Sequence, residues 1–340
     1  MISIKEGNLF ESGAECFVNT VNTVGVMGKG IALQFKQAFP ANYIAYKNAC
    51  AHGDVQPGRM FLYKTDMPEN PKIIVNFPTK RHWKEKTRIE DIISGLTDLT
   101  KVIREDSIKS IAIPPLGCGN GGLDWETVYP LITSSLSDLD DVEVFLYAPS
   151  GAPKVDEICV NTDKPKMTLS RAVVISLMDS YLIPDYRLSM LEIQKLAYFA
   201  QAYGQSLKLN FSKAQFGPYA ENLNHALQHM EGHYIRGYGD RSRNASIHLL
   251  PGAADEARAY LDGYPDVKQR LHKVENLIKG LESPYGMELL STVHFLMSEH
   301  PEAAESIDNL VVYVHSWNEH KKKAFECKHI EFAWRRLKSH

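Results

Sequence analysis

Two glycine-rich stretches of this 340-residue chain each separate an apolar segment from a helix-like one. The first reads CFVNTVNTVGVMGKGIA over residues 16–32, and the second reads PPLGCGNGGLDW over residues 114–125. Glycine lets a backbone approach a phosphate closely, and the first turn of a helix offers unpaired N–H groups to an anion. One such loop is weak support, because turns alone need glycine. Two of them favour a diphosphate-binding site.

A basic loop with an aromatic residue at its centre follows another apolar segment. It reads NFPTKRHWKEKTR over residues 76–88, and Trp83 lies among the cations Lys80, Arg81, Lys84, Lys86 and Arg88. A charge run of this kind is usually a solvated loop. This loop leaves the same predicted sheet edge as the glycine loops, however, and that position favours a functional role. Its cations would hold substrate phosphates, and Trp83 would stack on an unpaired base.

The elements that must position these loops alternate in type over the first half of the chain. Short apolar runs predict buried strands at residues 16–20, 72–76, 110–114 and 142–147. Apolar spacing predicts helices at residues 29–39, 43–52, 88–104 and 125–136. This alternation is typical of a three-layer α/β/α domain with a mixed, mostly parallel sheet, in which ligands bind at the carboxyl ends of the strands.

The second half predicts a mainly α-helical domain. Apolar spacing indicates helices at residues 169–181, 189–203, 218–231, 254–261, 265–281, 286–298 and 303–325, with one strand at 247–250. Ser189 is the expected N-cap of one helix, and Pro218 and Pro265 lie in the first turns of two others. Residues 151–166 combine Pro, Gly and charge without periodicity and predict a linker. The expected domains are therefore residues 1–152 and 167–340.

Composition indicates a soluble protein of a reducing compartment. The apolar and charged fractions, 44% and 23%, are average for a globular protein, and a net charge of −3 gives no global attraction to nucleic acid. The five scattered cysteines have no CxxC spacing, which argues against a disulfide framework and a zinc site. The N-terminal segment is unlike a signal peptide, and no apolar run reaches membrane-spanning length. We expect a cytoplasmic protein with no metal, no cofactor and no membrane partner.

The first half resembles the macrodomain family, whose members bind ADP-ribose. The similarity covers residues 1–150 and lies in EGNL at 6–9, VNTVN at 18–22, GKGIA at 28–32 and PLGCG at 115–119. It implies a set of residues that contact ADP-ribose: Asn8, Leu9, Asn19, Asn22, Gly28, Lys29, Gly30, Ile31, Gly117, Cys118, Gly119, Asn120, Gly121 and Gly122. Asn22 would hydrogen-bond the distal ribose, although the residues alone favour a turn-forming role. Many macrodomains contact adenine through an Asp near Asn8 or Leu9; Asn8 can accept a hydrogen bond but brings no charge.

The basic loop is also similar to that of the DarG-type branch of macrodomains, the DNA ADP-ribosyl glycohydrolase antitoxins. A lysine after this strand is catalytic in that branch, and the matching residue here is Lys80, with Lys84 and Lys86 as alternatives. The resemblance implies removal of ADP-ribose from DNA bases, with thymidine as the suggested base. Lys80 would act as a nucleophile, or as the acid or cation that assists the leaving base.

The resemblance also implies the remaining site residues of this region, and one departure from the family pattern limits what it implies. Asn22 would complete the catalytic site with Lys80, and the DNA would contact the three residues Trp83, Arg81 and Lys84. Some related hydrolases have an Asp inside the second glycine loop. This chain has Gly121 near that place and Asp124 three residues on, so a mechanism built on that Asp does not transfer.

The second half contains IQKLAYFAQAYG at 193–204 and FGPYAENL at 216–223, which resemble the SocA-type helical domain of bacterial antitoxins. An amphipathic core helix followed by a Pro-initiated helix is an equally good interpretation. The DarG-type layout implies that this domain binds a DarT-like toxin, while the first acts on ADP-ribosylated single-stranded DNA. Two alternatives stay open: a non-catalytic ADP-ribose reader, and a hydrolase of ADP-ribosylated protein or O-acetyl-ADP-ribose.

Overall fold

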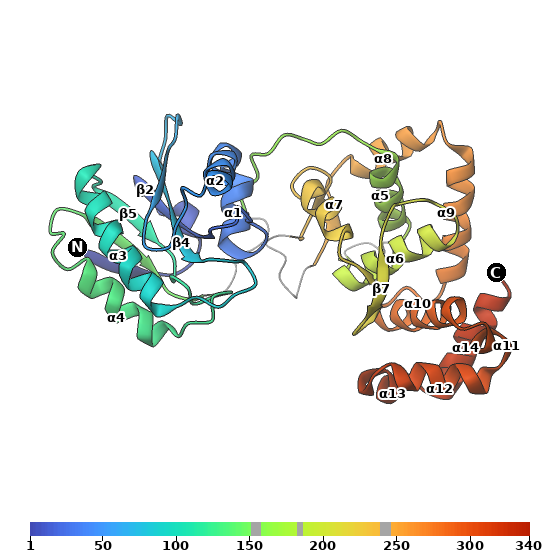
Figure 1. Ribbon diagram of the computed structural model, residues 1–340. Helices are drawn as coiled ribbons and strands as arrows, with labels where there is room; N and C mark the ends of the chain where they lie inside the picture. The colour runs from blue at the N-terminus through green and yellow to red at the C-terminus, as the bar shows by residue number, and fades with distance from the viewer. Residues whose placement is uncertain (151–157, 182–185, 239–245) are drawn as a thin grey trace. The chain divides into compact units, whose positions relative to one another are not determined.

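The chain divides into two compact units between Asp163 and Lys164 in the computed structural model. The structure describes residues 1–150, 158–181, 186–238 and 246–340 (Figure 1). The first seven residues of the predicted linker, 151–157, lie outside the described residues. Within the described ranges, no helix combines the length and apolar character needed to cross a bilayer.

The first unit is built on a six-stranded sheet with the order β1-β6-β5-β2-β4-β3. The strands are β1 (Ile2–Lys5), β2 (Cys16–Asn22), β3 (Phe61–Lys64), β4 (Ile73–Lys80), β5 (Ser110–Ile113) and β6 (Glu143–Tyr147). All neighbouring pairs are parallel except β3 with β4. The prediction of a mixed, mostly parallel sheet is confirmed. Sequence reasoning missed β1 and β3, the two edge strands, because each has residues that are only partly buried and lacks a continuous apolar core run.

Helices cover both faces of this sheet. They are α1 (Gly30–Ala38), α2 (Pro40–His52), α3 (Ile89–Glu105) and α4 (Trp125–Ser135). Side chains alternate along a strand, so Phe17 of β2 packs with Phe35 of α1 while Val18 lies in the core that contains Leu96 of α3. Figure 1 shows α1 and α2 on one side of the strands and α3 and α4 on the other. The three-layer prediction is confirmed. In the sheet, β2 is one of the two middle strands, and β4 lies between β2 and the edge strand β3.

The second unit is mainly helical around one hydrophobic core. Its helices are α5 (Leu169–Tyr181), α6 (Met190–Ala202), α7 (Leu223–Met230), α8 (Ala253–Leu261), α9 (Pro265–Ile278), α10 (Pro284–Glu299), α11 (Pro301–Glu305), α12 (Ile307–Trp317), α13 (Glu319–Ala324) and α14 (Cys327–Lys338). Two short antiparallel pairs accompany them: β7 (Phe211–Ala214) with β8 (Gly217–Ala220), and β9 (Ile235–Arg236) with β10 (His248–Leu249). Ser189 caps α6 as predicted, in a capping box with Glu192.

Two helix predictions in this unit are wrong. The helix predicted to begin at Pro218 starts only at Leu223, because Pro218 belongs to β8, where a two-stranded hairpin tolerates the missing N–H. The single helix predicted over 303–325 is three helices. Ser306 and Asn318 have extended backbones there and cap the helices that follow them, so each one ends the preceding helix. The last helix, α14, was not predicted.

The first unit extends past the predicted boundary at residue 152. Ile158 is buried, and Asn161 makes two hydrogen bonds to α1: its backbone N–H donates to Gln37 O at 2.9 Å, and its Nδ2 donates to Ala38 O at 2.9 Å. These contacts stabilise the end of the unit.

We therefore predict that residues 1–163 fold alone and bind ADP-ribose. A fragment of residues 1–152 lacks the two Asn161 hydrogen bonds and buried Ile158, together worth a few kcal/mol by typical magnitudes. Its melting temperature should be lower by about 5–10 °C in calorimetry. Equal melting temperatures would contradict the role given to residues 158–161.

Candidate active site at the carboxyl edge of the sheet

The central feature of the site is the pairing of Asn22 with Lys80 at the ends of two adjacent strands. β2 and β4 run in register from Cys16 opposite Ile73 to Val21 opposite Pro78. The register then shifts, so Asn22 lies opposite Lys80. A register shift of this kind re-aims the side chains that follow it. The two residues predicted as catalytic are thus brought together by the sheet itself.

Lys80 is half-buried and reaches the second glycine loop. Its Nζ donates a hydrogen bond to the backbone O of Asn120. Partial burial lowers the pKa of the Lys80 ammonium below its usual value, because desolvation disfavours the charged form. Lys80 therefore lies next to the proposed ligand loops. Its surroundings favour the neutral amine more than bulk water does.

The two glycine loops meet beside Lys80. A Cβ on Gly30 would lie 3.1 Å from Nδ2 of Asn120. Gly30 opens α1 with a φ of +57°, and its N-cap, Lys29, provides no side-chain cap. The N–H groups of the first turn of α1 are therefore available to an anion. This juxtaposition supports the predicted diphosphate site.

The second loop is held in shape by Gly121. A Cβ at this position would lie 2.1 Å from Gly117 O and 2.4 Å from Oγ1 of Thr87. Thr87 N–H donates to Gly121 O at 3.0 Å, and Leu123 N–H donates to Gly117 O at 3.1 Å. Thr87, at the end of the basic loop, therefore ties that loop to the glycine loop. The sequence carried no signal for this role.

Asn22 shapes the first loop through all of its side-chain polar atoms. Its Oδ1 accepts from the N–H groups of Val24 at 3.1 Å and Val26 at 3.3 Å, and its Nδ2 donates to Val26 O at 2.6 Å. The hydroxyl of buried Tyr46 donates to Asn22 O at 2.5 Å. This is the turn-forming arrangement that the residues alone favoured. Contact with the ribose remains a prediction.

The other predicted asparagines also have structural partners. Asn19 is fully buried, and its Nδ2 donates to Oδ1 of Asn76 at 3.0 Å, which in turn bonds with Asn42. The side chain of Asn8 caps the 3₁₀ helix at Leu9–Glu11, where its Oδ1 accepts from Phe10 N–H at 3.1 Å. The Leu9 side chain is buried in the apolar cluster that also contains Phe35 of α1.

The three residues of the basic loop that were predicted to contact DNA have different environments. Arg81 makes a bidentate ion pair with buried Asp91 of α3, at 2.5 and 2.9 Å, so its guanidinium is already occupied. Trp83 is 51% exposed and stacks on His82 with ring centroids 5.4 Å apart, and Lys84 Nζ lies 5.0 Å from the Trp83 ring. Trp83 and Lys84 are thus accessible to a ligand, whereas Arg81 anchors the loop to α3.

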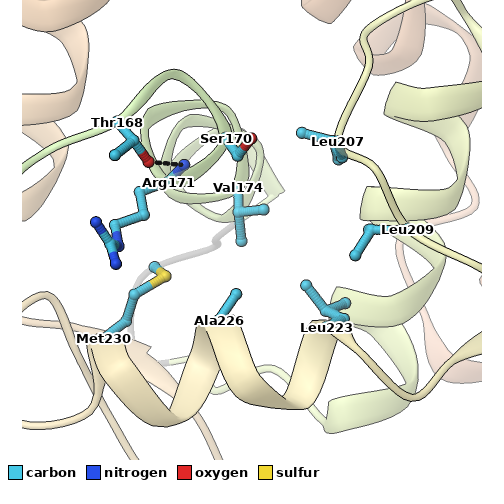
Figure 2. Close-up of a pocket in the computed structure, with 9 residues that line it drawn as sticks. All are labelled: Thr168, Ser170, Arg171, Val174, Leu207, Leu209, Leu223, Ala226 and Met230. Carbon is cyan, nitrogen blue, oxygen red and sulfur yellow. Dashed lines mark hydrogen bonds between the residues drawn. The ribbon is translucent and has the colours of Figure 1, made fainter.

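A cavity of about 150 Å³ lies in the second unit. Its lining is mostly apolar and comprises Thr168, Ser170, Arg171, Val174, Leu207, Leu209, Leu223, Ala226 and Met230 (Figure 2). Arg171 bonds locally, since its backbone N–H donates to Oγ1 of Thr168 at 3.4 Å and its guanidinium donates to Lys166 O at 2.5 Å. No predicted site residue lines this cavity. Among the residues that the structure describes, no cluster of His, Cys, Asp and Glu is suited to a metal ion.

Comparison with known proteins places the chain in a family. A Macro domain family model matches residues 18–132. The DNA ADP-ribosyl glycohydrolase of Thermus aquaticus is 46% identical over 333 residues, which cover 98% of this chain and 92% of the relative. The chain belongs to the DNA ADP-ribosyl glycohydrolase family. The macrodomain resemblance and the fold class, a macrodomain followed by a mainly helical part, are thereby confirmed.

Two other relatives cover less than half of the chain. The solved macrodomain of Mycobacterium tuberculosis DarG is 51% identical and covers 44% of this chain and 99% of its own, with a TM-score of 0.44. A DNA ADP-ribosyl transferase-DNA ADP-ribosyl glycohydrolase fusion protein of Thermosipho africanus is 37% identical over 163 residues, which cover 44% of this chain and 42% of the fusion.

The close contact at Gly121 gives a direct test of the loop's geometry. Gly121→Ala should lower the melting temperature and weaken ADP-ribose binding, because its Cβ would collide with the backbone at Gly117. Gly119→Ala is the matched control for stability, since the space around Gly119 is open. Scanning calorimetry should show a loss of several degrees for Gly121→Ala and about none for Gly119→Ala. The reverse order of the two variants would refute this account of the loop.

Proposed function

We propose that the first unit hydrolyses the glycosidic bond between ADP-ribose and a DNA base, with thymidine as the base, and that the second unit binds a DarT-like toxin. The observation that carries the enzymatic part is the position of Lys80, on a strand end between the two glycine loops. The whole-length similarity to a DNA ADP-ribosyl glycohydrolase supports the same reading.

The proposed roles follow from the groups available at the sheet edge. Main-chain N–H groups of residues 28–31 and 117–122 bind the diphosphate and the distal ribose. Asn22 holds the first loop in shape and contacts the ribose. Lys80 is close enough to both loops to act on the anomeric carbon of that ribose.

The reaction breaks the bond between the anomeric carbon and the base nitrogen. As a nucleophile, Lys80 Nζ bonds to the anomeric carbon while the bonding electron pair leaves with the base, which takes up a proton. Water then displaces the amine and releases free ADP-ribose. As an acid, Lys80 instead gives a proton to the leaving base, and water attacks directly. Both routes pass through an oxocarbenium-like state and need no metal.

Exposed Trp83 with Lys84 beside it favours a nucleic-acid substrate over the two alternatives. Neither an ADP-ribose reader nor a hydrolase of ADP-ribosylated protein or O-acetyl-ADP-ribose needs a base-stacking aromatic ring among cations. An unpaired base can stack on such a ring, and Lys84 can contact the adjoining phosphate. This arrangement supports single-stranded DNA as the substrate.

The fusion relative supports a DNA-modifying transferase as the partner. In that protein the transferase and the glycohydrolase belong to one chain, and the match spans 44% of the present chain. The present chain has a further, mainly helical unit. We propose that this unit binds the transferase when the two activities are on separate chains.

The catalytic assignment is tested with Lys80→Ala. This variant should abolish release of ADP-ribose from DNA but leave the affinity for free ADP-ribose nearly unchanged, because Lys80 acts mainly in the transition state. Lys101→Ala, which removes an exposed lysine of α3, is the control. Single-turnover release and calorimetry measure the two quantities. Full activity of Lys80→Ala would move the assignment to Lys84 or Lys86.

The pH dependence separates the two roles of Lys80. A nucleophile must be the neutral amine. The release rate should therefore rise with pH and level off above the pKa of Lys80, which burial holds below the usual value of 10.5. The Lys80→Ala variant should show no such rise. A rate that falls over the same pH interval would instead assign Lys80 the acid role.

The substrate assignment is tested with Trp83→Ala. Loss of base stacking should raise the KM for an ADP-ribosylated single-stranded oligonucleotide by about 5- to 100-fold, while Trp83→Phe keeps most of the affinity. Ile93→Ala, which truncates another exposed side chain of this unit, should change nothing. If Trp83→Ala and wild type have equal KM values on DNA, the stacking role is excluded.

A further inference from the structure

Arg81 is the first residue after β4, directly next to Lys80, and its side chain has a defined orientation. Its guanidinium makes two parallel hydrogen bonds to the carboxylate of Asp91: Nη1 donates to Oδ2 at 2.5 Å, and Nη2 donates to Oδ1 at 2.9 Å. Two parallel bonds fix the plane of the guanidinium as well as its distance from the carboxylate. The neighbour of the proposed catalytic lysine is therefore bonded in one geometry.

Asp91 is an anchor that belongs to the packed part of the first unit. Its side chain is 8% exposed and lies in the first turn of α3, where the helix dipole favours a negative charge. α3 itself contacts β4 closely, because a Cβ on Gly95 would lie 2.2 Å from the ring of Phe77. The ion pair therefore relates the position of Arg81 to a helix that packs tightly on the same strand.

The main chain of Arg81 is bonded from the other direction. The Thr23 hydroxyl donates to Arg81 O at 2.7 Å. Thr23 follows Asn22, which lies opposite Lys80 in the sheet. The end of β4 is thus held by α3 through the Arg81 side chain and by the first glycine loop through the Arg81 carbonyl group.

The charge around Arg81 is unfavourable for a DNA contact. The Arg81 side chain is 43% exposed, yet both of its terminal nitrogens donate to the carboxylate of Asp91. A DNA phosphate would have to compete with that carboxylate for the same N–H groups. The negative charge of Asp91 also offsets the attraction that Arg81 exerts on a phosphate. The pair is therefore better suited to fixing the chain than to binding the nucleic acid.

We propose that Arg81 is a positioning residue for Lys80: paired with Asp91 and bonded to Thr23, it fixes the end of β4 so that Lys80 stays directed at the second glycine loop. An error of about 1 Å in the placement of a reacting group can lower a rate about 100-fold. This inference rests on the proposed catalytic role of Lys80. It assigns Arg81 to the chemical step and not to DNA binding.

Asp91→Asn is the decisive variant, because it keeps Arg81 and removes the charge that holds it. Positioning predicts that kcat for release from an ADP-ribosylated single-stranded oligonucleotide falls about 10- to 100-fold, while the affinity for free ADP-ribose stays within about twofold of wild type. A DNA contact predicts a lower KM instead, because the released guanidinium would attract phosphate more strongly. Asp106→Asn, at the other end of α3 and ion-paired with Lys64 at 2.8 Å, is the matched control and should change neither quantity.

Two further variants test the same role independently of Asp91→Asn. Arg81→Lys keeps the positive charge but loses the two parallel bonds, so its kcat should fall as in Asp91→Asn, and the double variant should be no slower than either single one by more than about twofold. Thr23→Val removes only the hydroxyl bonded to Arg81 O. It should lower kcat by about 2- to 10-fold, and it tests the positioning role even if Asp91→Asn does not fold.

The opposite outcomes are distinguishable from a failure of the proposed catalytic assignment. Wild-type kcat and KM in both Asp91→Asn and Arg81→Lys would overturn the inference, and the role of Lys80 would stand if Lys80→Ala is inactive. Wild-type kcat with a lower KM in Asp91→Asn would make Arg81 a DNA contact. Full activity of Lys80→Ala, measured in parallel, would remove the catalytic assignment and the inference together.

Discussion

The parallel pairing of β2 with β4 is the constraint on which the site depends. The two strands are buried on both faces, so their hydrogen-bonded register cannot slip without exposing core side chains. Asn22 and Lys80 are consequently opposite each other at a rigid edge, with the register shift just before them. Sites built on strand ends of this kind are held more firmly than sites built on loops alone.

Backbone groups supply much of the proposed ligand-binding capacity. The polar side chains predicted to contact ADP-ribose are largely engaged within the chain: Asn22 shapes its own loop, Asn8 caps a 3₁₀ helix and Asn19 belongs to a buried amide chain. At the start of α1, by contrast, the N-cap side chain makes no hydrogen bond to the main-chain N–H groups of the first turn. The site would therefore recognise a diphosphate mainly through loop shape, which explains why close contacts at Gly121 matter.

Sequence reasoning succeeded where one physical signal dominates. The apolar run of β4 predicted a central strand, and the glycines predicted the two loops that the structure brings together. It failed where tertiary contacts decide: β3 is a partly buried edge strand, and Pro218 joins a hairpin because α6 and α12 hold it there. The pairing of Arg81 with Asp91 was also missed, because a separation of ten residues between a loop and a helix leaves no pattern.

The most direct measurement for the central claim is a crystal structure of the chain with bound ADP-ribose. The account predicts the diphosphate between residues 28–31 and 117–122, and the anomeric carbon of the distal ribose within about 4 Å of Lys80 Nζ, close to the distance at which reacting atoms approach. A complex in which the distal ribose points away from the end of β4, with Lys80 still bonded only to Asn120, would contradict it.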